Sequence, residues 1–212
     1  MSIRGWVYDK FIAADMTSRW YKDVLSSVPS GSRILDIGVG TAASLCMNKE
    51  LITRNDLHIT GVDYDRAYIT TATINCQLEN ISDNVNILEL DINTESIQDH
   101  LGKTEYDVVL LCGVLMITPD PSSVLKKASE ILKPGGCIYI VQTFGKATIP
   151  MLSWAKSMLW YVTSIDFGRD MTMDSMTMAI TQSGLKLVET RAVKHTTPGY
   201  FRDEIVLILT KQ

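Results

Sequence analysis

A short run of small residues early in the chain has the composition and spacing of a ligand-binding turn. The segment Ile34–Ile37 is apolar apart from one acid and leads into Gly38 and Gly40, and Thr41 and Ala42 follow. Glycine allows backbone conformations that a Cβ forbids and lets a ligand approach the main chain closely. Because the start of the next helix offers unpaired N–H groups, such a turn favours the carboxylate or phosphate of a nucleoside-bearing cofactor. A strand-to-helix turn without a ligand is the alternative.

Two acids at the ends of successive predicted strands could serve the same cofactor. Asp63 follows the second strand and Asp91 follows the third. A carboxylate at a strand end can accept hydrogen bonds from both ribose hydroxyls, as we expect of Asp63. Asp91 and the Ile92 N–H would bind the adenine amine and a ring nitrogen, while Tyr64 or Ile92 would cover the base. One Asp after a strand is often only a helix cap or turn former, but two beside a glycine turn favour a binding site.

Strands and helices alternate over the part of the chain that would position these residues. The predicted strands are Arg33–Ile37, Leu57–Val62, Val85–Leu90, Tyr106–Gly113 and Cys137–Thr143. The predicted helices start at Thr41, span 66–78, lie between the third and fourth strands, and span 122–132. The fourth and fifth strands are nearly continuous apolar runs, which is typical of a parallel sheet with helices on both faces. Right-handed crossovers then bring every strand end, with its acid, to one edge of the sheet.

Composition and charge narrow the class of protein. The chain has 212 residues, of which 46% are hydrophobic and 21% charged, and this favours one globular domain. A net charge of −4 without a cluster of Lys and Arg argues against a nucleic-acid partner. The cysteines lack metal-ligand spacing, so we predict no metal site and a reducing, cytoplasmic environment. No apolar run is long enough to span a bilayer, and charges interrupt the N-terminal segment where a signal-peptide core would lie.

Five blocks of the sequence together resemble the class I S-adenosylmethionine-dependent methyltransferases. They are Ile34–Ala43, Gly61–Asp63, Leu90–Ile92, Tyr106–Gly113 and Leu132–Gly136. The first is similar to the family's D-x-G-x-G-x-G motif, with Ala42 in place of the third glycine, and the last to its L-K-P-G-G turn. The resemblance implies an α/β, Rossmann-like three-layer sandwich with a seven-stranded, mostly parallel sheet. A sixth strand at 185–193 and an antiparallel seventh at 204–209 would complete it, with the last strand between the fifth and sixth.

The resemblance also implies the cofactor, S-adenosylmethionine, its product S-adenosylhomocysteine, and the residues that would bind them. The residues around the methionyl part would be Asp36, Gly38, Gly40, Thr41, Ala42 and Cys112. Asp36 would steer that network, often through water, and the Cys112 carbonyl would accept from the cofactor's amino group. We expect Ala42 to narrow the turn rather than to block the cofactor. Asp63 would bind the ribose, and Asp91 with Ile92 the adenine.

A nicotinamide cofactor is a less favoured alternative. The turn also fits the G-x-G-x-x-G/A fingerprint of dinucleotide-binding enzymes. However, Asp36 stands two residues before the first glycine, where it would repel a diphosphate but would be tolerated by a zwitterionic amino acid. A proton-relay motif of the kind that hydride transfer usually needs is also missing from the sequence.

The residues that contact the methyl acceptor leave no comparable motif. The candidates are His195 and Tyr8 for catalysis and Trp154, Arg169 and Tyr200 for substrate binding. His195 is the best general-base candidate because the pKa of a histidine can be set near neutrality. The very apolar stretch at 149–162 would form a helix that packs in the core, covers an apolar substrate as a lid, or touches a membrane surface. The fourth strand lacks the (Asp/Asn)-Pro-Pro-aromatic motif of enzymes that methylate nucleobase amines.

We therefore predict one methyltransferase domain with four parts: an N-terminal helical cap (1–30), a cofactor-binding core (31–143), a lid and helix (144–183) and a C-terminal strand pair (184–212). It would transfer a methyl group in line to a small, partly apolar acceptor. The alternatives are methylation of a protein side chain or N-terminus, and a non-catalytic cofactor-binding partner subunit. The acceptor atom and the oligomeric state stay open.

Overall fold

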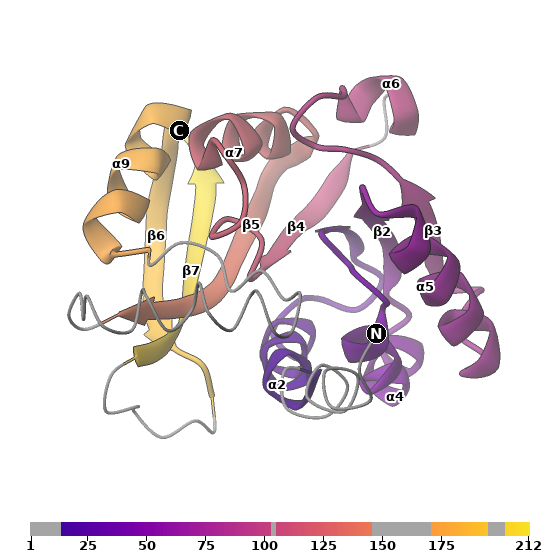
Figure 1. Ribbon diagram of the computed structural model, residues 1–212. Helices are drawn as coiled ribbons and strands as arrows, with labels where there is room; N and C mark the ends of the chain where they lie inside the picture. Colours follow the sequence, from indigo (N-terminus) through magenta and orange to yellow (C-terminus); the bar gives the residue numbers. More distant parts are fainter. Residues whose placement is uncertain (1–13, 103–104, 146–170, 195–201) are drawn as a thin grey trace, which may run out of the picture.

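The chain is built around a seven-stranded sheet with the strand order β3-β2-β1-β4-β5-β7-β6 (Figure 1). The structure is a computed structural model, and it describes residues 14–102, 105–145, 171–194 and 202–212. The strands are β1 (Arg33–Ile37), β2 (His58–Asp63), β3 (Val85–Glu89), β4 (Tyr106–Cys112), β5 (Leu132–Gly145), β6 (Leu185–Ala192) and β7 (Arg202–Lys211). β7 pairs antiparallel with both β5 and β6, whereas the pairs among β1 to β5 are parallel. The predicted insertion of an antiparallel last strand between the fifth and sixth is confirmed.

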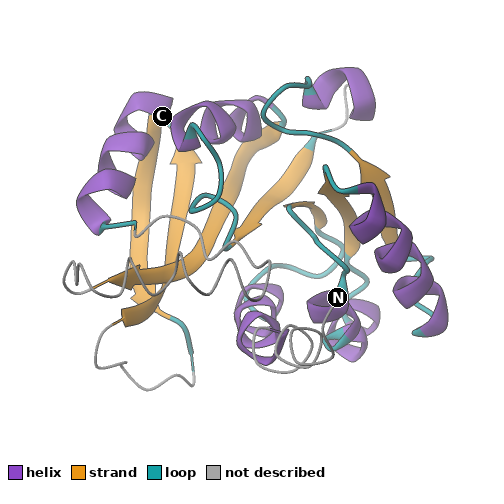
Figure 2. Cartoon of the chain, in the orientation of Figure 1, coloured by secondary structure: helices purple, strands orange, loops and turns teal. Residues whose placement is uncertain are grey.

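Helices cover both faces of this sheet (Figure 2). The described helices are α2 (Ala14–Leu25), α3 (Ala43–Cys46), α4 (Lys49–Arg54), α5 (Arg66–Leu78), α6 (Ile97–Leu101), α7 (Pro121–Glu130) and α9 (Met173–Ser183). Buried residues of α2, α3, α4 and α5 share one apolar cluster, and those of α6, α7 and α9 share the other. Side chains alternate along β1, so Ile34 joins the first cluster and Leu35 and Ile37 join the second. The three-layer arrangement predicted from the apolar strands is therefore observed.

The helix after the glycine turn differs from the prediction. The sequence favoured one helix from Thr41, but the chain forms two short helices, α3 and α4, that are separated at Asn48. The Asn48 side chain donates to the Ser44 carbonyl at 2.8 Å and to the Ser18 carbonyl at 3.0 Å. The backbone N–H of Asn48 donates to the Leu45 carbonyl instead, at 2.8 Å. A buried amide thus replaces one helical hydrogen bond and ties the break to α2.

The fifth strand also starts earlier than predicted. Leu132 already pairs with Tyr106, and the register then shifts before Val108 pairs with Cys137. Gly135, with φ of 80°, lies in the interval between the two registers. The predicted turn between α7 and the fifth strand is therefore an irregularity inside β5 rather than a connection that precedes it.

Some predicted parts lie wholly or partly outside the described residues. Of the N-terminal cap, α2 is described, and its residues Trp20, Tyr21, Val24 and Leu25 are buried against the sheet. The apolar stretch at 149–162 lies outside the described ranges. None of the described helices is both long and apolar enough to cross a membrane.

Candidate functional site

The C-terminal ends of β1, β2, β3 and β4 lie side by side, and we call this border of the sheet the carboxyl edge. Asp36 on β1 pairs with Gly61 on one side and with Leu110 on the other. Asp63 at the end of β2 pairs with Glu89, two residues before Asp91. The strand pairing therefore brings Asp36, Asp63, Asp91 and Cys112 to one edge, as the sequence predicted. Their binding roles stay predictions.

The glycine turn has the backbone that its sequence requires. Gly38 has φ of 78°, and a Cβ there would lie 2.4 Å from Val114 Cγ2, so no larger residue fits. Gly40 has φ of 57°, but a Cβ there would meet no atom of the described residues within 4 Å, so these residues leave this side of the turn open to a ligand. The N–H groups of Gly38 and Val39 both donate to the Val62 carbonyl, at 2.8 and 3.1 Å, and hold the turn against β2.

Ala42 takes the place of the third motif glycine at a cost in backbone strain. Its φ is 55° in the left-handed region, which costs a residue with a Cβ roughly 1–2 kcal/mol. The Ala42 methyl group is buried in the apolar cluster with Val39 and Leu45. The methyl group thus packs in the core, and the expected narrowing of the turn stays a prediction. Thr41 is linked to α5 through its carbonyl, which accepts from the Asn75 side chain at 2.9 Å.

Asp63 joins the glycine turn to the start of α5. Its Oδ2 accepts from the Gly40 N–H at 3.0 Å, and its Oδ1 accepts from the Asp65 N–H at 3.0 Å. Burial raises the pKa of Asp63 above its ordinary value, against the lowering effect of these N–H donors. Because an ionised carboxylate has about four acceptor positions, each oxygen can still accept from a ribose hydroxyl.

Asp36 is fully buried and only half satisfied. Its Oδ2 accepts from the Tyr21 hydroxyl of α2 at 2.7 Å, whereas Oδ1 has no hydrogen-bond partner among the described residues. Burial raises the pKa of Asp36 from its ordinary value of 3.8 to about 7, while the Tyr21 hydrogen bond opposes that rise. Burial and the Asp36 charge also raise the pKa of Tyr21, so this hydroxyl keeps its proton and donates. An unmet buried acceptor of this kind costs about 1–3 kcal/mol and calls for a donor.

Asp91 folds the loop that follows β3. Its Oδ1 accepts from the Asn93 N–H at 2.9 Å, and its Oδ2 from the Thr94 hydroxyl at 3.0 Å. Partial burial raises the pKa of Asp91, but these hydrogen bonds and the Lys127 charge outweigh it, so the pKa lies below its ordinary value. Asp91 therefore acts as a turn former, the alternative role that the sequence analysis gave to an Asp after a strand. Its Oδ2 can still accept a second hydrogen bond, for example from an adenine amine. Ile92 is buried, at 7% exposure, so its side chain covers little of the surface offered to a base.

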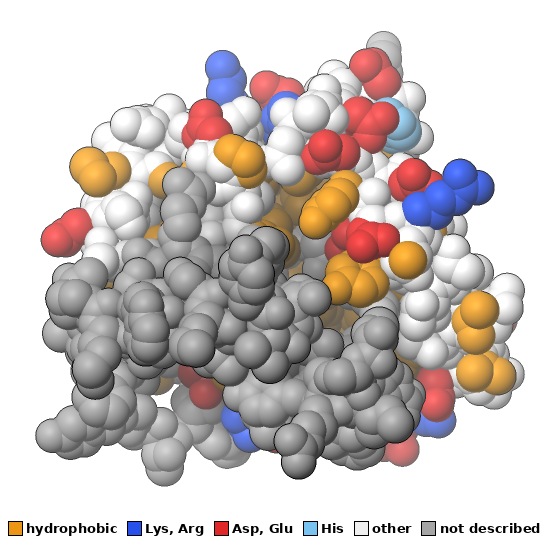
Figure 3. All heavy atoms as spheres, in the orientation of Figure 1, with side chains coloured by type: hydrophobic (Ala, Val, Ile, Leu, Met, Phe, Trp, Pro, Cys, Tyr) orange, Lys and Arg blue, Asp and Glu red, His pale blue; other side chains and the backbone are white. Residues whose placement is uncertain are grey.

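The surface beside this edge suits a flat, partly apolar ligand. The face over α5 and α6 carries acidic and apolar side chains together (Figure 3). Tyr64, between Asp63 and α5, is 65% exposed and so keeps an aromatic face available for a base. Cys112 ends β4, and the Gly113 N–H that follows donates to the Val141 carbonyl at 2.8 Å.

Two further residues near this edge were not predicted as site residues from the sequence. Trp20 of α2 lies against Gly113, where a Cβ would come 3.5 Å from the indole ring, and its Nε1 donates to the Glu204 carboxylate. Gln142 of β5 is fully buried, and its Oε1 has no partner in the part of the chain that the structure describes, while its Nε2 donates to the Met171 sulfur at 3.1 Å. It directly follows Val141, the partner of Cys112, and so belongs to the same border of the sheet.

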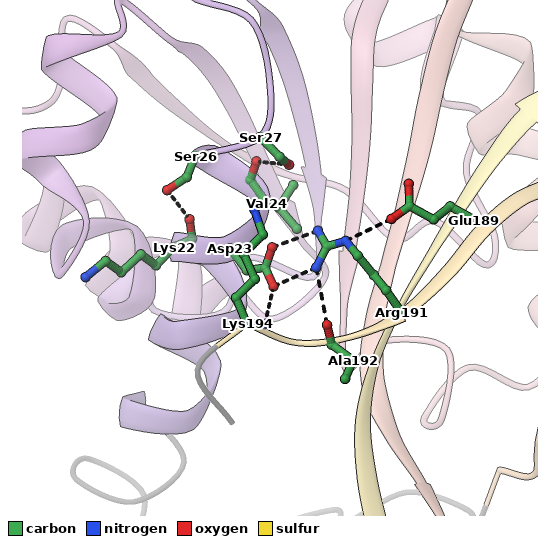
Figure 4. A network of polar contacts seen from close by, with 9 residues as sticks. All are labelled: Lys22, Asp23, Val24, Ser26, Ser27, Glu189, Arg191, Ala192 and Lys194. Carbon is green, nitrogen blue, oxygen red and sulfur yellow. Dashed lines mark hydrogen bonds and ion pairs between the residues drawn. The ribbon is translucent and has the colours of Figure 1, made fainter. Parts of the chain in front are cut away.

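A buried ion pair between α2 and β6, the outermost strand beside β7, fixes α2 in place (Figure 4). The Asp23 carboxylate accepts two hydrogen bonds from the Arg191 guanidinium, at 2.7 and 2.8 Å, and one from the Lys194 N–H at 2.6 Å. Arg191 also contacts Glu189 at 3.2 Å. Asp23 and Tyr21 belong to the same helix, so this anchor on β6 fixes the helix that carries the Tyr21 hydroxyl.

The predicted acceptor-side residues cannot be placed. Tyr8, Trp154, Arg169, His195 and Tyr200 lie outside the described residues. In the described part of the chain, no group of three or more His, Cys, Asp or Glu side chains has the arrangement of a metal site. The groups that the structure does bring together beside the glycine turn are hydrogen-bond acceptors. Two of these acceptors, Asp36 Oδ1 and Gln142 Oε1, have no donor among the described residues.

The sequence matches a family of known proteins over most of its length. The profile of the methyltransferase domain family matches residues 29–186. A ubiquinone biosynthesis O-methyltransferase of Aeromonas salmonicida is 30% identical over 112 residues, which are 52% of this chain and 42% of that protein. The chain thus spans less than half the length of this relative.

Solved structures share the fold at low sequence identity. The crystal structure of the cyclase SpnF has a TM-score of 0.71 with 14% identity, covering 91% of this chain and 81% of that one. A geranyl diphosphate C-methyltransferase from Streptomyces coelicolor A3(2), crystallised with S-adenosyl-L-homocysteine, has a TM-score of 0.69 with 11% identity. That match covers 93% of this chain and 79% of the other. At these identities the likeness shows the fold alone, and one of the two proteins carries a cyclase name.

Proposed function

The chain belongs to the methyltransferase domain family, and we propose that it is an S-adenosylmethionine-dependent enzyme that methylates a hydroxyl group of a small, partly apolar molecule. The hydroxyl acceptor is suggested by the O-methyltransferase name of the relative from Aeromonas salmonicida. The family match at residues 29–186 includes the whole predicted cofactor-binding core, residues 31–143.

The observation that carries the proposal is that Asp36 Oδ1 accepts from no group of the described residues. A fully buried carboxylate oxygen without a donor is expensive to keep, and a ligand ammonium group would satisfy it. Next to it, the open side of Gly40 leaves room for a ligand against the main chain. The methionyl end of S-adenosylmethionine carries both an ammonium group and a carboxylate, so it fits this combination of an acceptor and a glycine turn.

The remaining acceptors fit the nucleoside end. Asp63 keeps acceptor positions for two ribose hydroxyls, and Asp91 keeps one for the adenine amine. Tyr64 offers an exposed aromatic face for the base. When bound, the cofactor supplies an electrophilic methyl group on a positively charged sulfur.

The protein's contribution to the reaction is then mainly alignment. Holding donor and acceptor in line can supply about 7–11 kcal/mol of the barrier reduction. A general base is required only if the acceptor hydroxyl is protonated at the working pH, and His195 and Tyr8 stay the candidates for it. We also keep the expectation of a cytoplasmic enzyme without a nucleic-acid partner, which is supported by four free cysteines and the net charge of −4.

The proposal is tested by binding and turnover together. Calorimetry with S-adenosylmethionine and S-adenosylhomocysteine should show binding of both, and a panel of phenols, catechols, amines, thiols and carboxylates should release S-adenosylhomocysteine with the hydroxyl compounds. Binding without turnover on any compound would favour the non-catalytic partner subunit, and turnover on peptides alone would favour protein methylation. Absence of binding would refute the cofactor assignment itself.

A further inference from the structure

Lys127 of α7 reaches across to the loop after β3 and holds three of its backbone carbonyls. Its Nζ donates to the carbonyls of Ile92 at 2.6 Å, Glu95 at 3.0 Å and Asn93 at 3.2 Å. An ammonium group has three donors and no acceptor, so this arrangement uses all of them. Hydrogen bonds from a charged donor are also roughly twice as strong as neutral ones. The contact therefore fixes the shape of a loop that lies more than 30 residues earlier in the sequence.

The same loop is closed by hydrogen bonds within itself. The Asp91 carbonyl accepts from the Thr94 N–H at 3.2 Å and the Glu95 N–H at 2.8 Å. The Asp91 N–H donates to the Glu95 carboxylate at 2.7 Å. The Ile92 N–H, in contrast, donates to none of the described groups. This peptide is planar and trans, so an Asp91 carbonyl that faces into the loop points the Ile92 N–H away from it.

From these contacts we propose that Lys127 is a positioning residue that fixes the Asp91–Ile92 loop for recognition of the adenine base and so sets base selectivity. This role rests on the proposed function, since it assumes an adenosyl cofactor at the carboxyl edge. Asp91 and Ile92 present an acceptor and a donor side by side, which match the exocyclic amine and the ring nitrogen next to it. The hydrogen bonds of the Asp91 carbonyl orient the peptide that carries the Ile92 N–H. Lys127 holds the next peptide through the Ile92 carbonyl and so limits the rotation of the chain directly after that N–H.

The discriminating ligand is S-inosylhomocysteine, in which an oxo group replaces the adenine amine and the neighbouring nitrogen carries a proton. It presents an acceptor where Asp91 needs a donor and a donor where Ile92 needs an acceptor. The wild-type chain should bind it at least tenfold more weakly than S-adenosylhomocysteine. Lys127→Met keeps the apolar stem but removes the ammonium, so a loosened loop should cut this preference at least fivefold.

Matched variants separate this role from a general loss of structure. Lys126→Met removes the neighbouring exposed lysine of α7 and should leave both affinities and their ratio unchanged. Lys127→Arg keeps the charge and several donors and should restore part of the preference. If Lys127→Met weakened both ligands by the same factor, or weakened neither, the positioning role would be wrong.

Hydrogen exchange of the ligand-free protein tests the loop without reference to any cofactor. Amides of Thr94 and Glu95 should exchange at least tenfold faster in Lys127→Met than in Lys126→Met. Unchanged protection would overturn the role of Lys127 in holding the loop. If the wild-type chain bound neither nucleoside while the exchange difference appeared, the proposed function would fail but the loop contact would stand.

Discussion

The Tyr21 hydroxyl on α2 donates a hydrogen bond to Asp36 Oδ2 at the end of β1, over 2.7 Å. Both side chains are buried, and the other Asp36 oxygen has no partner within the described ranges. The helix α2, which precedes the sheet in the sequence, thus orients Asp36, the acid of the glycine-turn motif. The buried carboxylate then keeps one oxygen for a ligand, and this arrangement makes the helix part of the site rather than a simple cover.

Tyr21→Phe should cost about 1–3 kcal/mol of unfolding free energy, because it leaves a second buried carboxylate oxygen without a donor. The affinity for S-adenosylhomocysteine should fall as well, since Asp36 loses the group that orients it. Urea unfolding and calorimetry measure the two effects. Tyr106→Phe is the matched control, because that hydroxyl donates to Thr60 at 3.2 Å at the opposite end of β4. A Tyr21→Phe protein with unaltered affinity would show that the pair is structural only.

The raised pKa of Asp36 makes the stability of the ligand-free protein depend on pH. The folded chain keeps this proton up to a pH of about 7, whereas the unfolded chain releases it near its ordinary value of 3.8. The folded state therefore binds more protons in this interval, and its stability falls as the pH rises from about 4 to about 7. The loss from this group amounts to about 4 kcal/mol.

Asp36→Asn isolates that contribution, because the other carboxylates are shared by both proteins. The wild-type unfolding free energy minus that of the variant should decrease by about 3–4 kcal/mol between pH 4 and pH 7 and level off only above the folded-state pKa of about 7. Urea unfolding at several pH values gives the difference directly. A difference that stays constant over this range would show that Asp36 has an ordinary pKa and a partner that we have not identified.

Gln142→Leu should stabilise the protein by about 1–3 kcal/mol. The substitution removes a buried carbonyl oxygen that accepts from none of the described donors and replaces the amide by an apolar side chain of similar size. Only a weak contact from its Nε2 to the Met171 sulfur is lost. Ile140→Leu, two residues earlier on the same face of β5, controls for repacking and should cost less than about 1.5 kcal/mol. Destabilisation by Gln142→Leu would indicate that the amide has a partner in the folded protein.

The parallel strands and the acids at their ends could be predicted because they depend on local pattern, whereas the place of the last strand was implied by the family resemblance. Apolar runs that end in Gly38, Asp63 and Asp91 define parallel strands, and the crossover rule places their ends together. The break at Asn48 was missed, because its cause is a side-chain hydrogen bond to Ser18 in another helix. The sequence in that region contains no glycine or proline to signal it.

The supporting residues of the site could not be predicted for a similar reason. Tyr21 sits among apolar residues of an amphipathic helix, where an aromatic side chain is expected to pack in the core. A lysine such as Lys127 in a helix is expected to face solvent. Its hydrogen-bond acceptors are carbonyls of the loop after β3, and only the packing of α7 against that loop brings them within reach. Their partners are set by packing between elements, so no spacing within the sequence reveals them.

The most direct test of the account is calorimetric titration of S-adenosylhomocysteine into the wild-type chain and into Asp63→Ala, with the exposed Asp83→Ala as the control. Asp63 holds the Gly40 N–H and is assigned to the ribose, so its loss should weaken binding at least tenfold while the fold is retained by circular dichroism. Asp83→Ala should bind like the wild type. A wild-type chain that does not bind S-adenosylhomocysteine, or an Asp63→Ala protein that binds it equally well, would contradict a cofactor site at the carboxyl edge.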